Sequence, residues 1–193
     1  MSTSFARIRE LQRALDAGET TAVALTELAL SKIADPSGEG ATAFISVYKD
    51  QALAAARASD ILRAAGLSRS ALEGIPISIK DLFDYKGDVT RGASALLKDA
   101  PAATTNATLV DRLQEAGAII IGRTNMTEFA FSGIGINPHY GTPRAPWDRE
   151  HGRIPGGSSS GAGVSVADGM AVAAIGTDTG GSIRIPAAFC GIT

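Results

Sequence analysis

Apolar and polar positions along this chain follow two periods, and each period predicts one kind of secondary structure. Segments in which apolar residues recur every three or four positions predict amphipathic helices, and short apolar runs rich in β-branched residues predict strands. The helices are expected at residues 4–17, 21–34, 49–66, 106–116 and 159–168, and the strands at residues 42–47, 75–79, 118–121 and 170–175. From residue 42 onward, strands and helices therefore alternate.

Residues at the ends of these segments support the boundaries. Hydroxyl side chains can accept hydrogen bonds from the first N–H groups of a helix. Such side chains stand before three of the helices, namely Ser4, Thr20 or Thr21, and Thr105. Gly18 and Gly117 follow two helices, as is typical of helix ends. Residues 126–131 predict a further short helix, and the glycines and prolines of residues 133–155 predict a long loop.

The order of these elements indicates the fold class. Strands that alternate with helices are typical of an α/β protein with a mixed, largely parallel sheet that helices cover on both faces. The apolar strand at residues 170–175 is expected to be buried in that sheet. Residues 1–70 are mostly helical and contain no candidate chemistry, so we expect them to form an N-terminal helical cap. Residues 71–193 are expected to form the α/β core.

The composition is that of a globular protein without a strong electrostatic bias. The 193 residues are 45% hydrophobic and 20% charged, and the formal net charge of −2 gives no support to nucleic-acid binding. No apolar run approaches the ~18–20 residues that cross a bilayer, and residues 1–10 lack the apolar stretch of a signal peptide. The single cysteine, Cys190, is compatible with a reducing compartment. We therefore expect a cytoplasmic protein that contacts neither nucleic acid nor membrane.

A lysine closes the apolar strand at residues 75–79. A lysine at a strand end usually extends its amine to water. Ile75, Ile77 and Ile79, however, predict that this strand is buried. Apolar surroundings lower the pKa of an ammonium group, because burial disfavours the charged form. Lys80 is therefore a candidate general base near neutral pH.

Two loops rich in glycine and serine adjoin apolar segments in the last forty residues. They are Pro155-Gly-Gly-Ser-Ser-Ser-Gly161 and Gly176-Thr-Asp-Thr-Gly-Gly-Ser-Ile-Arg184. Such runs are commonly flexible linkers, but linkers do not normally lie between buried elements. Glycines allow successive backbone N–H groups to converge on one point, which suits a nucleophilic serine with an oxyanion hole. Ser158 and Ser182, each directly after a Gly-Gly pair, are the candidate serines.

Other kinds of site fit the sequence less well. A phosphate-binding loop needs a lysine at its end, and neither loop contains one; a dinucleotide-binding fingerprint is also missing. The two histidines, His139 and His151, lie in the long loop and with one cysteine are too few for a zinc site. Cys190 is more typical of a small buried residue than of a nucleophile. We therefore expect neither a metal nor a cofactor.

Taken together, these segments resemble the amidase signature family. The resemblance rests on the two loops with the following Ile185-Pro-Ala-Ala-Phe-Cys-Gly191, on Gly74-Ile-Pro-Ile-Ser-Ile-Lys-Asp81, and on Gly117-Ala-Ile-Ile-Ile-Gly-Arg-Thr-Asn-Met-Thr-Glu-Phe129. It extends from about residue 70 to the end of the sequence and more loosely through the N-terminal helices. The resemblance implies an α/β/α sandwich that hydrolyses amides with a Ser–cis-Ser–Lys triad.

By position, the resemblance implies a role for each residue of this triad. Ser182 is the nucleophile that forms the acyl-enzyme, Ser158 is a bridging serine that follows a cis peptide bond, and Lys80 finally accepts the proton. The implied donors of the oxyanion hole are the backbone N–H groups of Thr179, Gly180, Gly181 and Ser182. Asp178 and Arg184 flank the nucleophile, either as supports of the loop or as a surface ion pair.

The sequence departs from this family at its C-terminal side. Family members continue after the Cys-Gly pair with a segment similar to Gly-Leu-Lys-Pro, whereas this sequence ends at Thr193. We therefore expect a sandwich that is truncated at its C-terminal side, with an open sheet edge and without much of the substrate pocket. The expected partners are a small amide substrate and either a second copy of the chain or the missing C-terminal part.

Three functions remain open on the sequence alone. The first, slightly favoured, is a stand-alone amidase that releases ammonia or an amine from a carboxamide. The second is the glutaminase subunit of a tRNA-dependent amidotransferase, since that subunit shares the triad. The third is an inactive fragment of either protein. Hydrolysis of amides, ammonia release from glutamine, and the state of association of the chain would distinguish the three.

Overall fold

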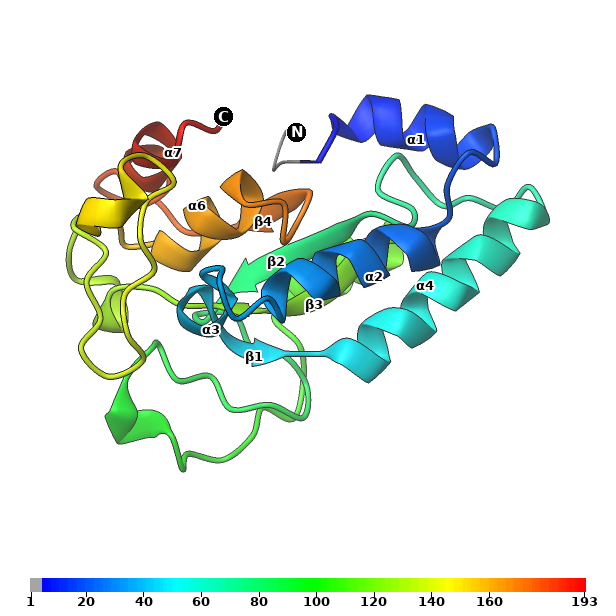
Figure 1. The fold of residues 1–193 in the computed structure, drawn as a ribbon. Coiled ribbons are helices and arrows are strands. Elements are labelled where there is room, and N and C mark those ends of the chain that lie inside the picture. Colours follow the sequence, from blue (N-terminus) through cyan, green and yellow to red (C-terminus); the bar gives the residue numbers. More distant parts are fainter. Residues whose placement is uncertain (1–4) are drawn as a thin grey trace.

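The computed structural model describes residues 5–193 of the chain (Figure 1). Its helices and strands, in chain order, are α1 (Ile8–Asp16), α2 (Ala22–Ile33), α3 (Gly40–Ala43), β1 (Phe44–Val47), α4 (Lys49–Ala64), β2 (Pro76–Lys80), α5 (Thr108–Glu115), β3 (Ile119–Thr124), α6 (Ser160–Ala167), β4 (Ala173–Ile175) and α7 (Arg184–Cys190). Short 3₁₀ turns lie at Ala95–Leu97, Glu128–Ala130 and Arg149–His151. None of the described helices is long and apolar enough to span a membrane.

The four strands form one mixed sheet with the order β1-β3-β2-β4. Strand β2 runs parallel to both β3 and β4, whereas β1 pairs with β3 in the antiparallel sense. The predicted α/β class with a mixed, largely parallel sheet is therefore confirmed. Since β2 and β4 are parallel neighbours, Lys80 at the end of β2 and the loop that follows β4 emerge at the same edge of the sheet.

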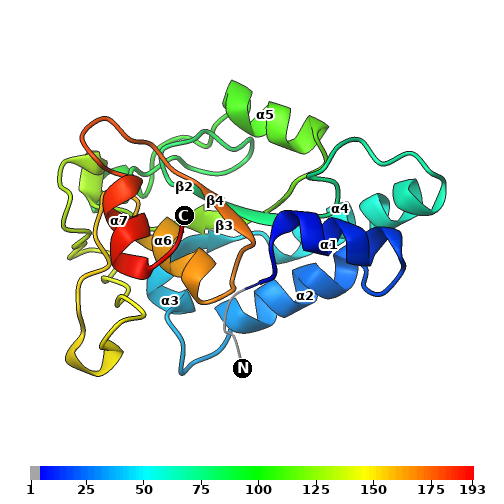
Figure 2. The same cartoon turned by 90° about the horizontal axis from the view of Figure 1, so that it is seen from above.

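Helices cover both faces of this sheet, as predicted, and each face has its own hydrophobic cluster. Ile119 and Ile121 of β3 pack in one cluster with Val164 of α6 and with small residues of α2 and α4. Ile120 of the same strand packs in the other cluster with apolar residues of β2 and α5. Neighbouring side chains of a strand point to opposite faces, so consecutive isoleucines serve both clusters. Figure 2 shows α5 on one side of the sheet and α2 on the other.

The N-terminal boundaries of two helices differ from those predicted. Helix α1 begins at Ile8, where the Arg7 N–H donates to Glu10 Oε2 at 3.1 Å; the predicted cap at Ser4 lies outside the described residues. The prediction of Thr105 as the cap of α5 is wrong, because the Ala107 N–H donates to Asp84 O at 2.9 Å and the helix starts only at Thr108. The cap of α2 at Thr21 is confirmed, since its hydroxyl accepts from Ala24 N.

The strands also differ from the sequence-based expectation. The strand expected at 42–47 starts at Phe44, because Gly40–Ala43 forms the short helix α3. Strand β3 continues to Thr124, beyond the expected end. The expectation of a fully buried strand at 170–175 is wrong: β4 covers only Ala173–Ile175 and is half-buried, because it forms an edge of the sheet with β2 as its neighbour.

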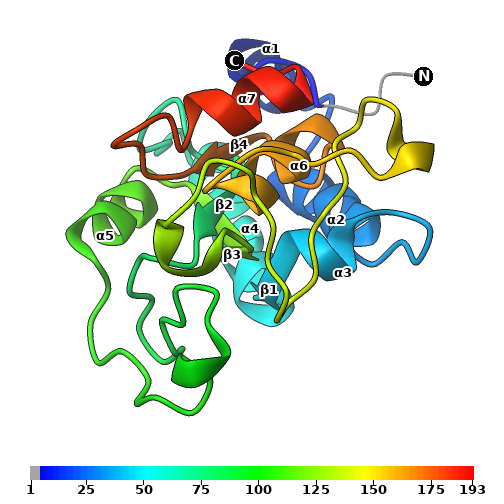
Figure 3. The same cartoon turned by 90° about the vertical axis from the view of Figure 1, so that its left-hand side faces the viewer.

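Two further features concern the first seventy and the last ten residues. Strand β1 belongs to residues 1–70, so this part of the chain adds a strand to the sheet as well as helices; the boundary at residue 70 stays a prediction. Helix α7 was not expected. It packs against α6 at the end of the sheet where β2 and β4 terminate, as Figure 3 shows.

Candidate active site

Lys80 lies at the carboxyl end of β2 and is completely buried. Its Nζ donates a hydrogen bond to Ser158 Oγ at 2.6 Å and another to Thr177 Oγ1 at 2.9 Å. Burial lowers the pKa of Lys80 to about 8, and the negative charge of Asp178 opposes part of this shift. The structure thus brings the predicted base into contact with one of the two predicted serines, and the base is partly neutral near physiological pH.

Ser158 is held by the segment around it. The Gly157–Ser158 peptide bond is cis, as the resemblance implied. The Ser158 carbonyl oxygen accepts from Thr127 N and Ser160 N, both at 3.0 Å, and Gly157 N donates to Gly133 O at 2.7 Å. A Cβ atom on Gly157 would lie 2.7 Å from both Gly135 N and Thr127 Oγ1, so only glycine fits at this position. This packing fixes the Ser158 hydroxyl in front of Lys80.

The start of α6 immediately after Ser158 depends on another close backbone approach. A Cβ atom on Gly161 would lie 2.2 Å from Ala43 O and 2.7 Å from Asn125 N. The Gly161 N–H donates to Asn125 O at 2.9 Å. The first turn of α6 therefore rests directly on the backbone of α3 and of the segment after β3, which explains why this loop is rich in small residues.

The predicted nucleophile, Ser182, is half-buried and lies beside the Ser158 segment. The Ser159 N–H donates to the Ser182 carbonyl oxygen at 3.1 Å, which joins the two loops. Among the described residues, the Ser182 hydroxyl forms no hydrogen bond with Ser158 or Lys80. The structure therefore brings the three predicted residues into one region, with the Lys80–Ser158 contact formed and the Ser158–Ser182 contact open.

Asp178 organises the loop that carries Ser182. Its carboxylate accepts from the backbone N–H groups of Gly181 at 2.8 Å, Ile183 at 3.0 Å and Arg184 at 3.1 Å. The Arg184 guanidinium also donates to both carboxylate oxygens and, with these N–H groups, holds the pKa of Asp178 well below its usual range. Asp178 thus supports the loop, in agreement with one of the two interpretations of the sequence, and the exposed side chain of Arg184 completes an ion pair with it.

The four N–H groups predicted to form the oxyanion hole differ in whether they already donate a hydrogen bond. The Gly181 N–H is already engaged by Asp178, which differs from the expectation that it faces an oxyanion. The N–H groups of Thr179, Gly180 and Ser182 donate no hydrogen bond within residues 5–193. Three of the four N–H groups are thus available to a ligand, and their role as an oxyanion hole stays a prediction.

A buried ion pair next to Lys80 was not predicted from the sequence. Asp81 and Arg123 are both completely buried, with Asp81 Oδ1 2.9 Å from Arg123 Nη1. Arg123 also donates to the carbonyl oxygens of Phe83 and Val89, while Asp81 accepts from Ala93 N at 2.9 Å. Burial raises the pKa of Asp81, although Arg123 partly offsets the shift. The pair ties the ends of β2 and β3 to the following loop. The available signal in the sequence was an acidic residue directly after one apolar strand and a basic residue within the other.

The two histidines take no part in this cluster. His139 Nε2 lies 3.4 Å from Glu128 Oε1, and His151 Nδ1 lies 2.6 Å from Asp148 Oδ1. Both pairs are partly exposed and belong to loops. In the part of the chain that the structure describes, three or more His, Cys, Asp or Glu side chains do not gather as a metal would require.

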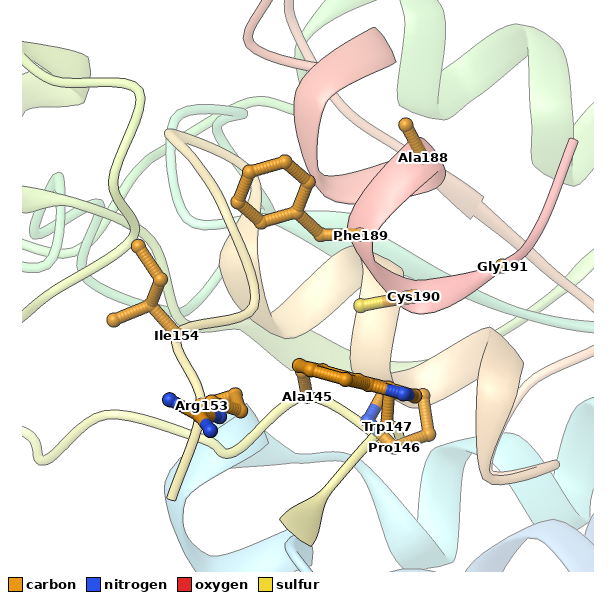
Figure 4. A pocket seen from close by; sticks show the side chains of 9 residues that line it. All are labelled: Ala145, Pro146, Trp147, Arg153, Ile154, Ala188, Phe189, Cys190 and Gly191. Carbon is orange, nitrogen blue, oxygen red and sulfur yellow. The ribbon is translucent and has the colours of Figure 1, made fainter. Parts of the chain in front are cut away.

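Cys190 lines an apolar hollow that lies away from the lysine and serine cluster. The hollow has a volume of about 770 Å³ and separates α7 from the long loop (Figure 4). Its walls include Trp147, Phe189 and Ile154, and the Arg153 guanidinium lies 5.4 Å from the centroid of the Trp147 ring. Burial raises the pKa of the Cys190 thiol to about 12, so the thiol is protonated at neutral pH and is a poor nucleophile.

Comparison with known sequences places this geometry in context. The sequence model of the Amidase family matches residues 24–193. The A subunit of glutamyl-tRNA(Gln) amidotransferase from Chromohalobacter salexigens is 45% identical over 186 residues, which are 96% of this chain and 37% of that protein. The corresponding protein of Thermobifida fusca is 45% identical over 183 residues, or 95% of this chain and 36% of that protein. The chain therefore spans a little over a third of the length of these relatives.

Solved structures give a similar picture. The peptide amidase of Stenotrophomonas maltophilia superposes with a TM-score of 0.84 and is 37% identical, covering 96% of this chain and 38% of that one. A chain of a vestigial protein complex, described in connection with the origins of an s-triazine catabolic enzyme, has a TM-score of 0.90 and 40% identity, covering 96% and 40%. The A subunit of glutamyl-tRNA(Gln) amidotransferase from Thermotoga maritima has a TM-score of 0.68 and 35% identity, covering 86% and 33%.

Proposed function

Since this chain belongs to the Amidase family, we propose that it carries the centre of an amidohydrolase that cleaves a carboxamide C–N bond through an acyl-enzyme on Ser182. The observation that carries the proposal is the contact of 2.6 Å between the buried Lys80 amine and the Ser158 hydroxyl. A lysine with a pKa of about 8 is partly neutral near pH 7 and can accept a proton. No histidine is needed for that step.

In the first half of the reaction, Ser182 Oγ attacks the amide carbon. The new C–O bond forms while the electron pair of the C=O double bond moves to the carbonyl oxygen. The proton of Ser182 passes to Ser158, whose own proton passes to Lys80, because a hydroxyl can donate and accept at once. Catalytic hydrogen bonds are often long without substrate and shorten in the reaction complex. The relay therefore requires the Ser182 side chain to turn toward Ser158.

In the second half, the amide C–N bond breaks and the leaving nitrogen takes the proton back through the same relay. Ammonia or an amine departs and leaves the acyl group on Ser182. Water then adds to the acyl carbon, releases a carboxylic acid and restores the serine. The N–H groups of Thr179, Gly180 and Ser182 are the proposed donors to the oxyanion in both halves, and each such donor is typically worth ~3–4 kcal/mol.

Because the chain spans about 37% of the length of its relatives, the substrate and the partners are also part of the proposal. The proposed substrate is a small linear amide in the cytoplasm. The proposed partner is either a second copy of the chain or a polypeptide that corresponds to the rest of the relatives, which would cover the half-buried edge strand β4. The proposed reaction uses no cofactor and no contact with nucleic acid or membrane.

A second function is favoured by one specific observation. Identity of 45% over 96% of the chain connects it to the A subunit of glutamyl-tRNA(Gln) amidotransferases. In that role, the protein would release ammonia from glutamine for use by a partner. The higher TM-score of the peptide amidase, 0.84 against 0.68, favours the stand-alone amidase. A chain without activity of its own is the third outcome.

A panel of carboxamides that includes glutamine and C-terminal peptide amides tests these functions. Ammonia and the carboxylic acid product are measured with the purified protein, with Ser182→Ala and with Ser159→Ala. Ser159→Ala is the matched control, because the Ser159 hydroxyl is buried without a hydrogen-bond partner in the described structure. Hydrolysis that Ser182→Ala abolishes and Ser159→Ala retains supports the proposal, and hydrolysis that survives Ser182→Ala refutes it. If glutamine were the only amide of the panel that the protein hydrolysed, this result would support the amidotransferase function.

A further inference from the structure

The Lys80 amine has two hydrogen-bond partners, and the proposed reaction uses only one of them. Ser158 Oγ is the partner in the proton relay, whereas Thr177 Oγ1, at 2.9 Å, has no part in it. We infer that Thr177 is a positioning residue that fixes the rotation of the Lys80 amine, so that one direction of Nζ that the lone pair can occupy faces Ser158. This inference rests on the proposed function and adds a residue to it.

The chemistry of a neutral amine makes such a partner necessary. A neutral lysine has two N–H bonds and one lone pair, and only the lone pair can accept the proton of Ser158. Rotation about the last C–N bond would otherwise turn an N–H bond toward Ser158 as readily as the lone pair. Thr177 Oγ1 accepts one N–H at a fixed position, and the branched side chain of threonine restricts its own rotation. With that N–H held, the lone pair no longer points at Thr177 and takes one of the two other directions at Nζ, one of which faces Ser158.

The fold places Thr177 beside Lys80 through the register of the sheet. Ile175, the last residue of β4, pairs with Ile79, which directly precedes Lys80 in β2. Gly176 follows, and a Cβ atom there would lie 2.7 Å from Ser159 Oγ. Glycine at this position therefore lets the chain pass close to the Ser158 segment before Thr177 reaches Lys80. The backbone pairing of β2 with β4 thus brings the side chains of Lys80 and Thr177 within reach of each other.

A neutral partner also suits the charges that surround Lys80. Asp178 already raises the pKa of Lys80 through its negative charge, although burial outweighs this effect. Asp81, the next residue along the chain, is compensated by the buried Arg123. A carboxylate in place of Thr177 would stabilise the ammonium form further and leave less neutral amine. A hydroxyl orients the amine without adding a charge.

The pKa of Lys80 can be measured directly, because the sequence contains only five lysines. They are Lys32, Lys49, Lys80, Lys86 and Lys98. In the protein labelled with ¹³C at lysine Cε, the resonance that disappears in Lys80→Met belongs to Lys80. A hydrogen bond to a hydroxyl stabilises the ammonium more than the amine. We expect Thr177→Val to lower the titration midpoint of Lys80 by roughly one pH unit and Thr177→Ser to leave it close to that of the wild type.

Thr124→Val is the matched control. Thr124 pairs with Lys80 across the two strands, and its hydroxyl is also buried, but that hydroxyl donates to Ile79 O at 3.3 Å and forms no hydrogen bond with the Lys80 amine. The Lys80 midpoint should stay at the wild-type value in this variant, although the melting temperature falls. An unchanged midpoint in folded Thr177→Val, or an equal shift in Thr124→Val, would overturn the inference.

A second measurement separates this inference from the proposed function. An alkyl fluorophosphonate phosphonylates activated serines with loss of fluoride, and intact-mass spectrometry gives its rate of reaction with Ser182. At a pH above both Lys80 midpoints, Thr177→Val should react roughly tenfold more slowly than the wild type and Thr177→Ser at nearly the wild-type rate. Equal rates in all three proteins would overturn the positioning role. A wild type that never reacts at Ser182, together with a shifted Lys80 midpoint, would refute the proposed function alone.

Discussion

The amine of Lys80 lies 2.6 Å from the hydroxyl oxygen of Ser158, although 78 residues separate the two in the sequence. Lys80 comes from the end of a buried parallel strand, and Ser158 from the turn that opens α6. Neither side chain has access to solvent. The contact therefore depends on the packing of the strand, the turn and the loop after β4, and the following predictions test these parts separately.

The burial of Lys80 predicts how stability depends on pH. Its pKa is about 8 in the folded protein against 10.5 in the unfolded chain, so the unfolded chain binds more protons between these values. The free energy of unfolding should therefore increase with pH across this interval, by as much as about 3 kcal/mol. Urea unfolding of the wild type and of Lys80→Met at several pH values measures the effect. A difference between the two proteins that is constant from pH 8 to pH 10.5 would contradict it.

The buried pair of Asp81 and Arg123 predicts a large loss of stability when one partner loses its charge. Asp81→Asn removes the buried counter-charge of Arg123 and leaves only the partly exposed Asp88, 3.7 Å from Arg123 Nε, so we expect a loss near the lower end of the about 3–5 kcal/mol that breaking a buried ion pair typically costs. The matched control is Asp16→Asn, because Asp16 is largely exposed in its ion pair with Arg63 and should contribute less than about 1 kcal/mol. Equal losses in the two variants, measured by urea unfolding, would show that the buried pair has no special role.

The close packing around Gly157 predicts that a side chain larger than that of glycine destabilises the protein at this position. In Gly157→Ala the new methyl group would lie 2.7 Å from Gly135 N, so one of the two loops must move, and we expect a loss of about 1–3 kcal/mol. In Gly180→Ala the methyl group meets no atom within 4 Å, and the stability should change by less than about 0.5 kcal/mol. Thermal unfolding of both variants compares the two sites. Wild-type stability in Gly157→Ala would mean that the loops are not packed as described.

Asp178 and Arg184 form one ion pair, but we expect their replacement to change the reactivity of Ser182 to different extents. Asp178→Ala removes the acceptor of three backbone N–H groups in the loop of Ser182, so the rate of phosphonylation of Ser182 should fall about 100-fold. Arg184→Gln removes an exposed guanidinium, and the rate should stay within about threefold of the wild type. If the two variants lost reactivity equally, the ion pair rather than the backbone contacts would organise the loop.

Much of the fold followed from the sequence because its signals are local, whereas the contact of Lys80 with Ser158 was implied by the resemblance to the amidase signature family. The apolar strand before Lys80 and the glycine–serine loops are continuous segments, and the mixed sheet follows from their alternation with helices. The partner of Arg123 and the contact between Thr177 and Lys80 depend on the pairing of strands that are distant in the sequence. The engagement of the Gly181 N–H depends on a loop conformation that a glycine-rich sequence leaves free.

The errors in the predicted elements have a similar cause. Thr105 looks like a helix cap, but a backbone contact between Ala107 and Asp84 delays the start of α5. The apolar run of residues 170–175 looks like one buried strand, yet only Ala173–Ile175 form β4, and pairing with β2 on one side alone leaves β4 half-buried. In both cases tertiary contacts decide between conformations that the local sequence allows.

The rate at which a fluorophosphonate modifies Ser182, measured as a function of pH, tests the central claim most directly. If Lys80 is the base, the rate should be low at acidic pH and rise through a midpoint near 8, where Lys80 loses its proton. The adduct should map to Ser182, and Lys80→Met should react at least about 100-fold more slowly. An adduct on another serine, or a rate in Lys80→Met equal to that of the wild type, would contradict the account.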